Sequence, residues 1–292
     1  MNNNQGFTKY FKILALIAVL LIVVGVTGAW VLSEHVGGST TTLEETVNVE
    51  GVLNVSIRST IQRIRVRAIA GNEARVISSG IPANATLIAE VEDGVLTIET
   101  RLPRQMTFGI HFGGFGLFTD SPTLDVYLPS VVYEQVTINS TTGRVEIADF
   151  SINDLQIEVT TGGIELSDIV GNVNVRTSTG RITATRMVGE HLHFRATTGA
   201  INLSDLTGDV DAQTSTGRIT FENATIAQNV NLQTTTGGVN VNLETEPENA
   251  MFSLTTTTGG TTVFGNNSGG QQFGDGRYEV TLRTTTGRIT VE

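Results

Sequence analysis

The sequence predicts an all-β protein built as a parallel β-solenoid (β-helix-like) with irregular N-terminal β coils, preceded by one transmembrane helix. Three observations carry this prediction. A short turn motif repeats along the C-terminal half, apolar and polar residues alternate between the turns, and a long uncharged apolar segment lies near the N-terminus. The first two observations predict the fold, and the third predicts how the chain is held at a membrane.

A Ser/Thr-Thr-Gly motif recurs eight times, and its glycines are 19, 18, 19, 18, 20, 22 and 28 residues apart. A sharp arc between short strands needs a positive φ angle, which glycine adopts without steric cost. No strand-to-helix phosphate loop accompanies the motif. We therefore predict that these glycines are structural turn residues: Gly143, Gly162, Gly180, Gly199, Gly217, Gly237, Gly259 and Gly287.

Between the turns the sequence alternates with period two, as in Leu155-Gln156-Ile157-Glu158-Val159. Such alternation is typical of a strand with one buried face. One unit is too short to bury its own apolar face, whereas units stacked about 4.8 Å apart share a continuous core. The threonines before each glycine are expected to stack into ladders, with their hydroxyls bonded to backbone or water.

The residue after each turn glycine alternates between arginine and a small residue: Arg144, Gly163, Arg181, Ala200, Arg218 and Gly238. If each unit forms one coil, neighbouring arginines lie two strand spacings apart and their repulsion is eased. If two units form one coil, the arginines stack directly. We expect one unit per coil, so Gly143 should approach Gly162 more closely than Gly180.

Residues 13–32 contain no charge and are long enough for a helix that spans a bilayer. Lys9 and Lys12 precede this segment and Glu34 follows it, which predicts a cytoplasmic N-terminus and a single-pass cell-membrane anchor. The alternative is a cleaved signal peptide. Both interpretations make residues 34–292 extracytoplasmic. The expected divisions are a tail (1–12), the transmembrane helix (13–32), a linker (33–45), an irregular β portion (46–130) and the repeat solenoid (131–292).

The irregular portion contains the strongest basic stripe. Arg63, Arg65 and Arg67 alternate along one predicted strand, so they share a face. They are candidates for binding anionic headgroups or an acidic wall polymer. The alternative is an exposed strand face whose arginines pair with local glutamates.

Two glycine-rich segments interrupt the pattern. Residues 106–118, with Phe112 and Phe115, are aromatic and uncharged. We expect them either to plug the open end of the solenoid or to form an apolar loop that contacts a partner or the membrane. Residues 266–276 are expected to form a polar loop, which explains the wide spacing before the last turn glycine.

Little in the sequence indicates catalysis, and we predict no enzyme, catalytic residue, metal site or cofactor. The chain has no cysteine and none of the common catalytic motifs. His191 and His193 share a strand face but lack a third metal ligand. Six residues after successive glycines stand Asp149, Asp168, Arg186, Asp205 and Asn223. We interpret them as a solvated turn ladder in which the arginine offsets its acidic neighbours, with a weak calcium site as the alternative.

The overall charge argues against nucleic-acid binding. The chain carries −11 at pH 7, and because both lysines precede the first acidic residue, the remainder carries −13. Proteins that bind nucleic acids neutralise phosphates with basic side chains. The sequence indicates no oligomeric state, although a chain that ends within a repeat unit raises self-association through its last strand (Thr290 to Glu292) as a further possibility.

Two adjacent segments carry a resemblance to known proteins: Leu124 to Pro129 (LDVYLP), and the strand and turn from Val136 to Gly143 (VTINSTTG). The chain resembles a family of bacterial β-strand-repeat proteins whose members are labelled adhesins by inference from their shape. The resemblance covers roughly residues 46–292. It implies a membrane-anchored solenoid and carries over no catalytic residue. We therefore expect a non-enzymatic cell-envelope protein that presents a binding, adhesion or scaffold surface to envelope polymer or glycan. One alternative is an accessory or regulatory partner of a membrane envelope-stress sensor; another is a polysaccharide-acting β-helix enzyme.

Overall fold

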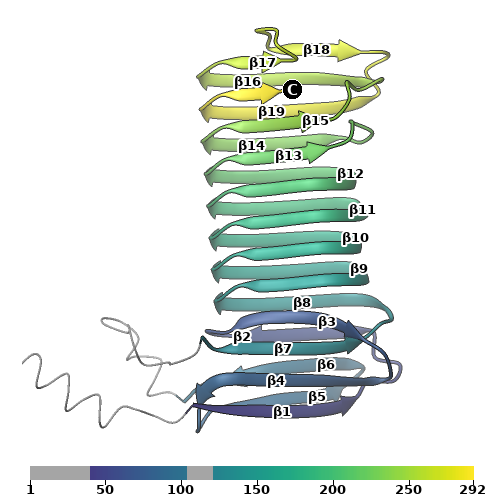
Figure 1. The fold of residues 1–292 in the computed structure, drawn as a ribbon, viewed down its shortest axis with the longest axis vertical. Helices are drawn as coiled ribbons and strands as arrows, with labels where there is room; N and C mark the ends of the chain where they lie inside the picture. The colour runs from purple at the N-terminus through teal and green to yellow at the C-terminus, as the bar shows by residue number, and fades with distance from the viewer. Residues whose placement is uncertain (1–39, 104–120) are drawn as a thin grey trace, which may run out of the picture.

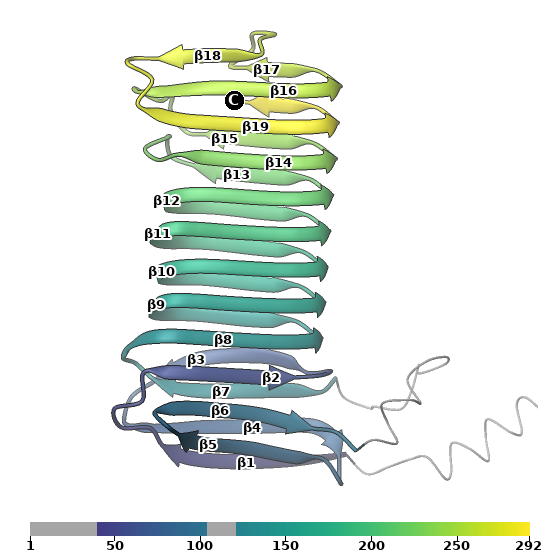
Figure 2. The same ribbon diagram turned by 180° about the vertical axis from the view of Figure 1, so that it is seen from behind.

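The computed structural model describes residues 40–103 and 121–292, and these residues form strands and turns throughout. Within these two ranges no helix is long and apolar enough to cross a membrane. The expected anchor (13–32) and the aromatic segment (106–118) lie outside the described residues. The described chain is wound into a tall stack of strands with two broad faces, which Figures 1 and 2 show from opposite sides.

Face A is the first of the two faces. Its strands pair in the spatial order β1-β4-β7-β3, then the first parts of β9 to β12, then β13-β15-β20-β17. The strands that belong to it alone are β1 (Thr40–Asn48), β3 (Arg63–Ile69), β4 (Glu73–Pro82), β7 (Thr123–Pro129), β13 (Ile219–Asn223), β15 (Val239–Leu243), β17 (Thr261–Val263) and β20 (Ile289–Val291).

Face B carries the longer strands that lead into the turn glycines. Its spatial order is β5-β6-β2-β8, then the last parts of β9 to β12, then β14-β19-β16-β18. The strands confined to face B are β2 (Asn54–Ser59), β5 (Thr86–Glu92), β6 (Val95–Arg101), β8 (Val132–Thr142), β14 (Val230–Thr236), β16 (Ala250–Thr258), β18 (Gly270–Phe273) and β19 (Tyr278–Thr286).

Four long strands run continuously from face A to face B: β9 (Val145–Thr161), β10 (Ile164–Thr179), β11 (Ile182–Thr198) and β12 (Ile201–Thr216). Each pairs with the next in parallel, for example Val145 with Ile164 and Ile164 with Ile182. The amide of Gly143 donates to Thr161, directly before Gly162. These pairings confirm the expectation of one sequence unit per coil.

The turn glycines are required by the close approach of successive coils. All eight have φ between 138° and 157°, where side chains other than hydrogen are strained. A Cβ atom on Gly162 would lie 1.7 Å from the carbonyl oxygen of Gly143, and one on Gly199 would lie equally close to that of Gly180. No heavier residue fits at these positions unless the coils move apart.

The coils do not stack entirely in sequence order. β19 lies between β14 and β16, and β20 lies between β15 and β17, so the last unit of the chain is inserted one coil before the end of the stack. Figure 2 shows β19 between β14 and β16. Near the other end, β2 lies between β6 and β8, and β3 lies between β7 and β9.

This arrangement corrects two sequence-based expectations. The possibility of self-association through the last strand is wrong. β20 is paired on both edges, so it has no free edge for a second copy. The 266–276 segment is not loop alone, because β18 pairs antiparallel with β16. Its Phe273 packs edge-on against Phe252 and Phe264 and thereby covers the end of the core.

The opposite end is closed by antiparallel strands of the irregular N-terminal portion. β1 pairs with β4 and β4 with β7, while β5 and β6 form a hairpin whose turn residues Asp93 and Gly94 have positive φ. β1 begins at Thr40, within the segment that we expected to be a linker (33–45). Its threonines and its pairing partner β4 favour the strand there.

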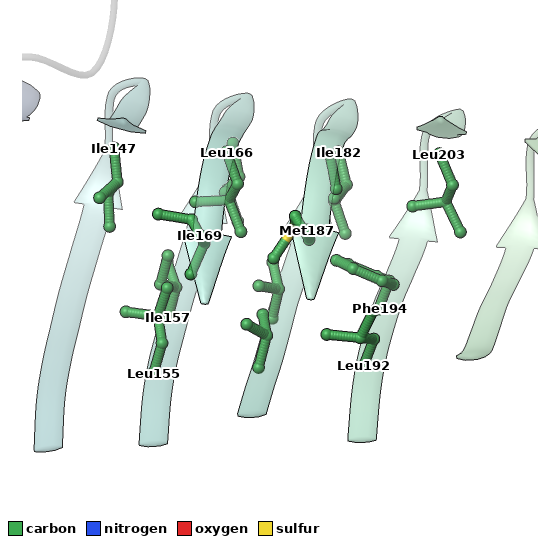
Figure 3. Packing of buried hydrophobic residues seen from close by; sticks show 14 of the residues in the cluster. Ile147, Leu155, Ile157, Leu166, Ile169, Ile182, Met187, Leu192, Phe194 and Leu203 are labelled. Carbon is green, nitrogen blue, oxygen red and sulfur yellow. The ribbon is translucent and has the colours of Figure 1, made fainter. Parts of the chain in front are cut away.

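The core is one continuous column of apolar side chains between the two faces. Figure 3 shows side chains from neighbouring coils pointing inward in layers. Phe194 on face B and Ala184 on face A belong to the same strand, β11, and both are fully buried. Large and small side chains within one coil hold the layer at the volume that close packing requires.

Candidate functional site: a polar groove along face B

A groove of about 670 Å³ lies on face B. In each coil it is bounded by two outward-pointing positions, four and two residues before the turn glycine, with the inward-pointing position between them as its floor. Because the coils stack in parallel, these positions form straight columns along the solenoid. The groove therefore follows the solenoid axis across seven coils.

One wall is a charged and amide-bearing column, the groove column, and it consists in spatial order of Glu158, Arg176, Arg195, Gln213, Gln233, Arg283 and Thr255. Arg176 and Arg195 occupy directly paired positions on β10 and β11. The Arg195 guanidinium lies 3.7 Å from an oxygen of Asp211, whereas Arg176 and Arg283 have no ion pair within the described residues. Three guanidinium groups thus share the groove with one carboxylate, Glu158.

The other wall is a ladder of exposed hydroxyl groups: Thr160, Ser178, Thr197, Ser215, Thr235, Thr285 and Thr257. Beneath it, a second set of threonines is mostly buried and satisfies the turn carbonyls. Thr214 Oγ1 donates to Gly199 over 3.1 Å, and Thr284 Oγ1 donates to Gly237 over 2.9 Å. These hydrogen bonds confirm the expectation that threonine hydroxyls bond the backbone. They also fix the strand edge that carries the exposed ladder.

Two further hollows adjoin the groove, besides a smaller one of about 240 Å³ that shares Glu158 and Arg176 with it. One of about 320 Å³ shares Glu158 and Thr160 with it and continues toward β2 and β6. The other, of about 430 Å³, shares Gln233 and Arg283 and contains His191 and His193. Nowhere in residues 40–103 and 121–292 do three His, Asp or Glu side chains gather so as to hold a metal ion.

The predicted arginine stripe lies on β3, and therefore on face A, away from the groove. Arg65 pairs with Asp125, with a nitrogen–oxygen distance of 2.6 Å, and Arg63 lies 3.8 Å from Glu146. Arg65 and Arg67 line a separate hollow of about 280 Å³ together with Glu146. Local carboxylates thus offset part of the stripe's charge. Phe112 and Phe115, the other predicted binding residues, lie outside the described residues.

The acidic turn column forms a corner with left-handed backbone. Asp149, Asp168, Arg186 and Asp205 have φ between 53° and 64°. Arg186 donates two hydrogen bonds of 2.7 and 2.6 Å to Asp168, and these bonds lower the pKa of that carboxyl below its ordinary value. This geometry confirms that the arginine offsets its acidic neighbours in the turn ladder.

Other resolved pKa shifts have structural causes. The hydrogen bonds from Arg75 and Arg101 lower the pKa of Glu44 and Glu99, respectively. Burial raises the pKa of Tyr133 to about 12, and its hydroxyl donates to the carbonyl of Pro129 over 2.9 Å. These interactions hold strands and a turn in place.

Sequence reasoning missed the groove, although a signal for it was present. When the eight repeats are aligned on their turn glycines, the residue four positions earlier is Asn, Glu, Arg, Arg, Gln, Gln, Thr or Arg. Arg176, Arg195 and Arg283 are separated by 19 and 88 residues in the chain, so they attract no attention as a cluster. Only the stacking of coils brings them onto one wall.

The fold and the groove define a class of protein: a capped parallel β-solenoid with an elongated polar surface groove. The chain belongs to the family described as Toastrack DUF4097, whose model matches residues 53–292. The comparison with curated proteins gives no match.

Solved structures similar to this chain include three bacterial proteins. A candidate adhesin from Bacteroides fragilis is 11% identical with a TM-score of 0.49, over 87% of this chain and 99% of that one. A candidate cell adhesion protein from Clostridium sporogenes is 13% identical with a TM-score of 0.33, over 87% and 99%. A candidate adhesin from Parabacteroides distasonis is 9% identical with a TM-score of 0.40, over 87% and 98%.

Proposed function

We propose that this chain is a non-enzymatic cell-envelope protein that presents its solenoid outside the cytoplasm as a binding or adhesion surface. The apolar segment 13–32 would hold it in the membrane with its N-terminus in the cytoplasm. The observation that carries the proposal is the groove on face B, where a hydroxyl group recurs on each of seven coils beside a column of charged and amide side chains. Contacts repeated at a fixed spacing suit a partner that is itself repetitive, such as an envelope polymer or glycan.

The composition of the groove supports binding over catalysis. Glycoside hydrolysis commonly uses two carboxyl groups that flank the bond to be cleaved. The groove is lined by a single carboxylate, Glu158, and the rest of its walls are hydroxyl, amide and guanidinium groups.

Retention on the cell's own envelope tests this proposal. Full-length protein in a neutral detergent is immobilised and exposed to solubilised envelope at low and moderate salt. We expect capture of polymer or glycan that weakens as salt rises, because exposed charges are screened. Capture of one membrane protein without polymer would instead support the accessory-partner function. Shortening of a captured polymer would contradict a non-enzymatic role.

A further inference from the structure

We infer that the groove on face B binds a linear polysaccharide that carries carboxylate groups, with the polymer chain lying along the solenoid axis. This inference deepens the proposed function, on which it rests, by naming the class of ligand. It depends on three features of the groove: its charge, its shape and the chemistry of its walls.

The charge of the groove is opposite to that of the body. Three arginines and one glutamate line it, in a chain whose residues after the lysines carry −13. Arg176 and Arg195 are paired directly across neighbouring strands, and like charges in such positions destabilise a sheet. A ligand carboxylate bound between the two guanidinium groups would relieve this repulsion, and arginine binds carboxylates through two parallel hydrogen bonds.

The length of the groove along the solenoid axis suits a linear ligand. Its walls extend over seven coils, which at about 4.8 Å per strand spacing gives a length of about 29 Å. A compact small molecule would occupy a fraction of this length, whereas an extended polymer can contact every coil. An extended chain of pyranose sugars can therefore contact several coils at once.

The walls favour a saccharide over a protein partner. Protein interfaces use aromatic and large apolar anchors at their centre. Among the residues that the structure describes, the groove lining contains no aromatic side chain, and its apolar members, Val159 and Ala196, lie on the floor. Instead, eight hydroxyl groups (the seven of the ladder and that of Thr255) and two glutamine amides line the walls. These groups can donate and accept hydrogen bonds, as sugar hydroxyls require.

Two matched variants locate the site. The groove variant combines Arg176→Gln, Arg195→Gln and Arg283→Gln. The stripe variant combines Arg63→Gln, Arg65→Gln and Arg67→Gln, so it removes the same charge from face A. A third variant with lysine at the three groove positions keeps the charge but loses the two-pronged geometry. A urea midpoint of the groove variant that is no lower than that of the wild type would show that the solenoid remains intact.

The probe is immobilised polygalacturonate, and its fully methyl-esterified form serves as the uncharged control. Full-length protein in neutral detergent should bind the acid form, lose affinity as salt rises, and bind the ester weakly. The groove variant should bind about tenfold more weakly or worse, since three charged contacts are removed. The lysine variant should fall between it and the wild type, and the stripe variant should bind as the wild type does.

Several results would overturn the inference. Unchanged binding by the groove variant, or loss of binding in the stripe variant alone, would place the site elsewhere. Equal binding of acid and ester would remove the role of the carboxylates. If the wild type fails to bind polygalacturonate but is retained on its own envelope, the ligand class falls while the proposed function stands. If it binds neither, both fall.

Discussion

The insertion of the last coil within the stack makes a quantitative prediction about three leucines. Leu282 on β19 is paired with Leu232 on one side and with Leu254 on the other. Leu232 and Leu282 are fully buried, and Leu254 is 5% exposed. If the coils stacked in sequence order, Leu254 would instead neighbour Leu232, and Leu282 would lie at the end of the stack.

Each single Leu→Ala substitution should lower the free energy of unfolding by about 2–5 kcal/mol, because it removes buried methyl groups and leaves a cavity. The order of the coils determines how pairs combine. Leu232 and Leu282 are in neighbouring coils, so their coupling energy should reach about 0.5–3 kcal/mol. Leu232 and Leu254 are two strand spacings, about 9.6 Å, apart. Because these two leucines share only the partner Leu282, their coupling energy should be clearly smaller than that of the directly paired Leu232 and Leu282.

Equilibrium urea unfolding of full-length protein in neutral detergent measures these energies. Far-ultraviolet circular dichroism and tyrosine fluorescence must give coincident transitions, because long repeat arrays can unfold in parts. Tyr278 on β19 and Tyr133 on β8 report from two separate parts of the stack. Coupling between Leu232 and Leu254 together with additivity between Leu232 and Leu282 would refute the inserted order.

Three further predictions concern the turns. Gly199→Ala should cost more than about 4 kcal/mol or abolish folding in a urea titration, because its Cβ atom would meet the Gly180 carbonyl at 1.7 Å. Gly163→Ala should stay within about 0.5 kcal/mol of the wild type, since its nearest atom lies at 3.5 Å; an equal loss in both variants would refute this reasoning. Arg186→Asp should lower the urea midpoint by adding a carboxylate beside Asp168, and calcium should restore it; a midpoint insensitive to calcium would contradict the prediction. Because the Arg186 hydrogen bonds lower the pKa of Asp168, their stabilisation is present above its ordinary value of 3.8 and is lost as the pH falls below it. The stability difference between wild type and Arg186→Gln should therefore shrink in acid, and a constant difference from pH 7 to pH 2 would exclude this origin.

The repeat and its turns could be predicted from the sequence because they depend on local rules. A glycine every 18 to 20 residues and a period-two alternation specify coils, turns and the buried face. Face A and face B, and the one-unit coil, follow from stacking those elements. These features need no knowledge of which coil lies beside which.

The order of the coils at the two ends could not be predicted in the same way. A parallel pairing of β14 with β19 or of β14 with β16 satisfies the same hydrogen bonds and the same alternation. Residues 264–276 favour the pairing of β14 with β19. Within them β18 pairs antiparallel with the outer edge of β16 and so holds β16 at the end of the stack. The groove depended on this order as well, since it places Arg283 beside Gln233 rather than beyond Thr255.

The spatial order also explains the residues that follow the turn glycines. Read along the chain, the alternation of arginine with small residues breaks at Gly260, which follows Gly238. Read along the stack, Arg288 lies between them and the alternation holds over all eight coils. The Cβ atom of an alanine at Gly238 would lie 4.0 Å from the Arg218 side chain, and one at Gly163 would lie 3.8 Å from that of Arg144, so these two arginines extend over their small neighbours.

The two arginine columns therefore follow opposite rules within one solenoid. Along the turn, arginines such as Arg144 and Arg181 are kept two coils apart, which limits repulsion between like charges. In the groove, Arg176 and Arg195 are placed on adjacent coils, where the repulsion is greatest. Placing like charges side by side in the groove column lowers the stability of the fold there. Local choices that lower stability in this way concentrate at functional sites. Along its turns this solenoid keeps arginines on alternate coils, and in the groove it does not.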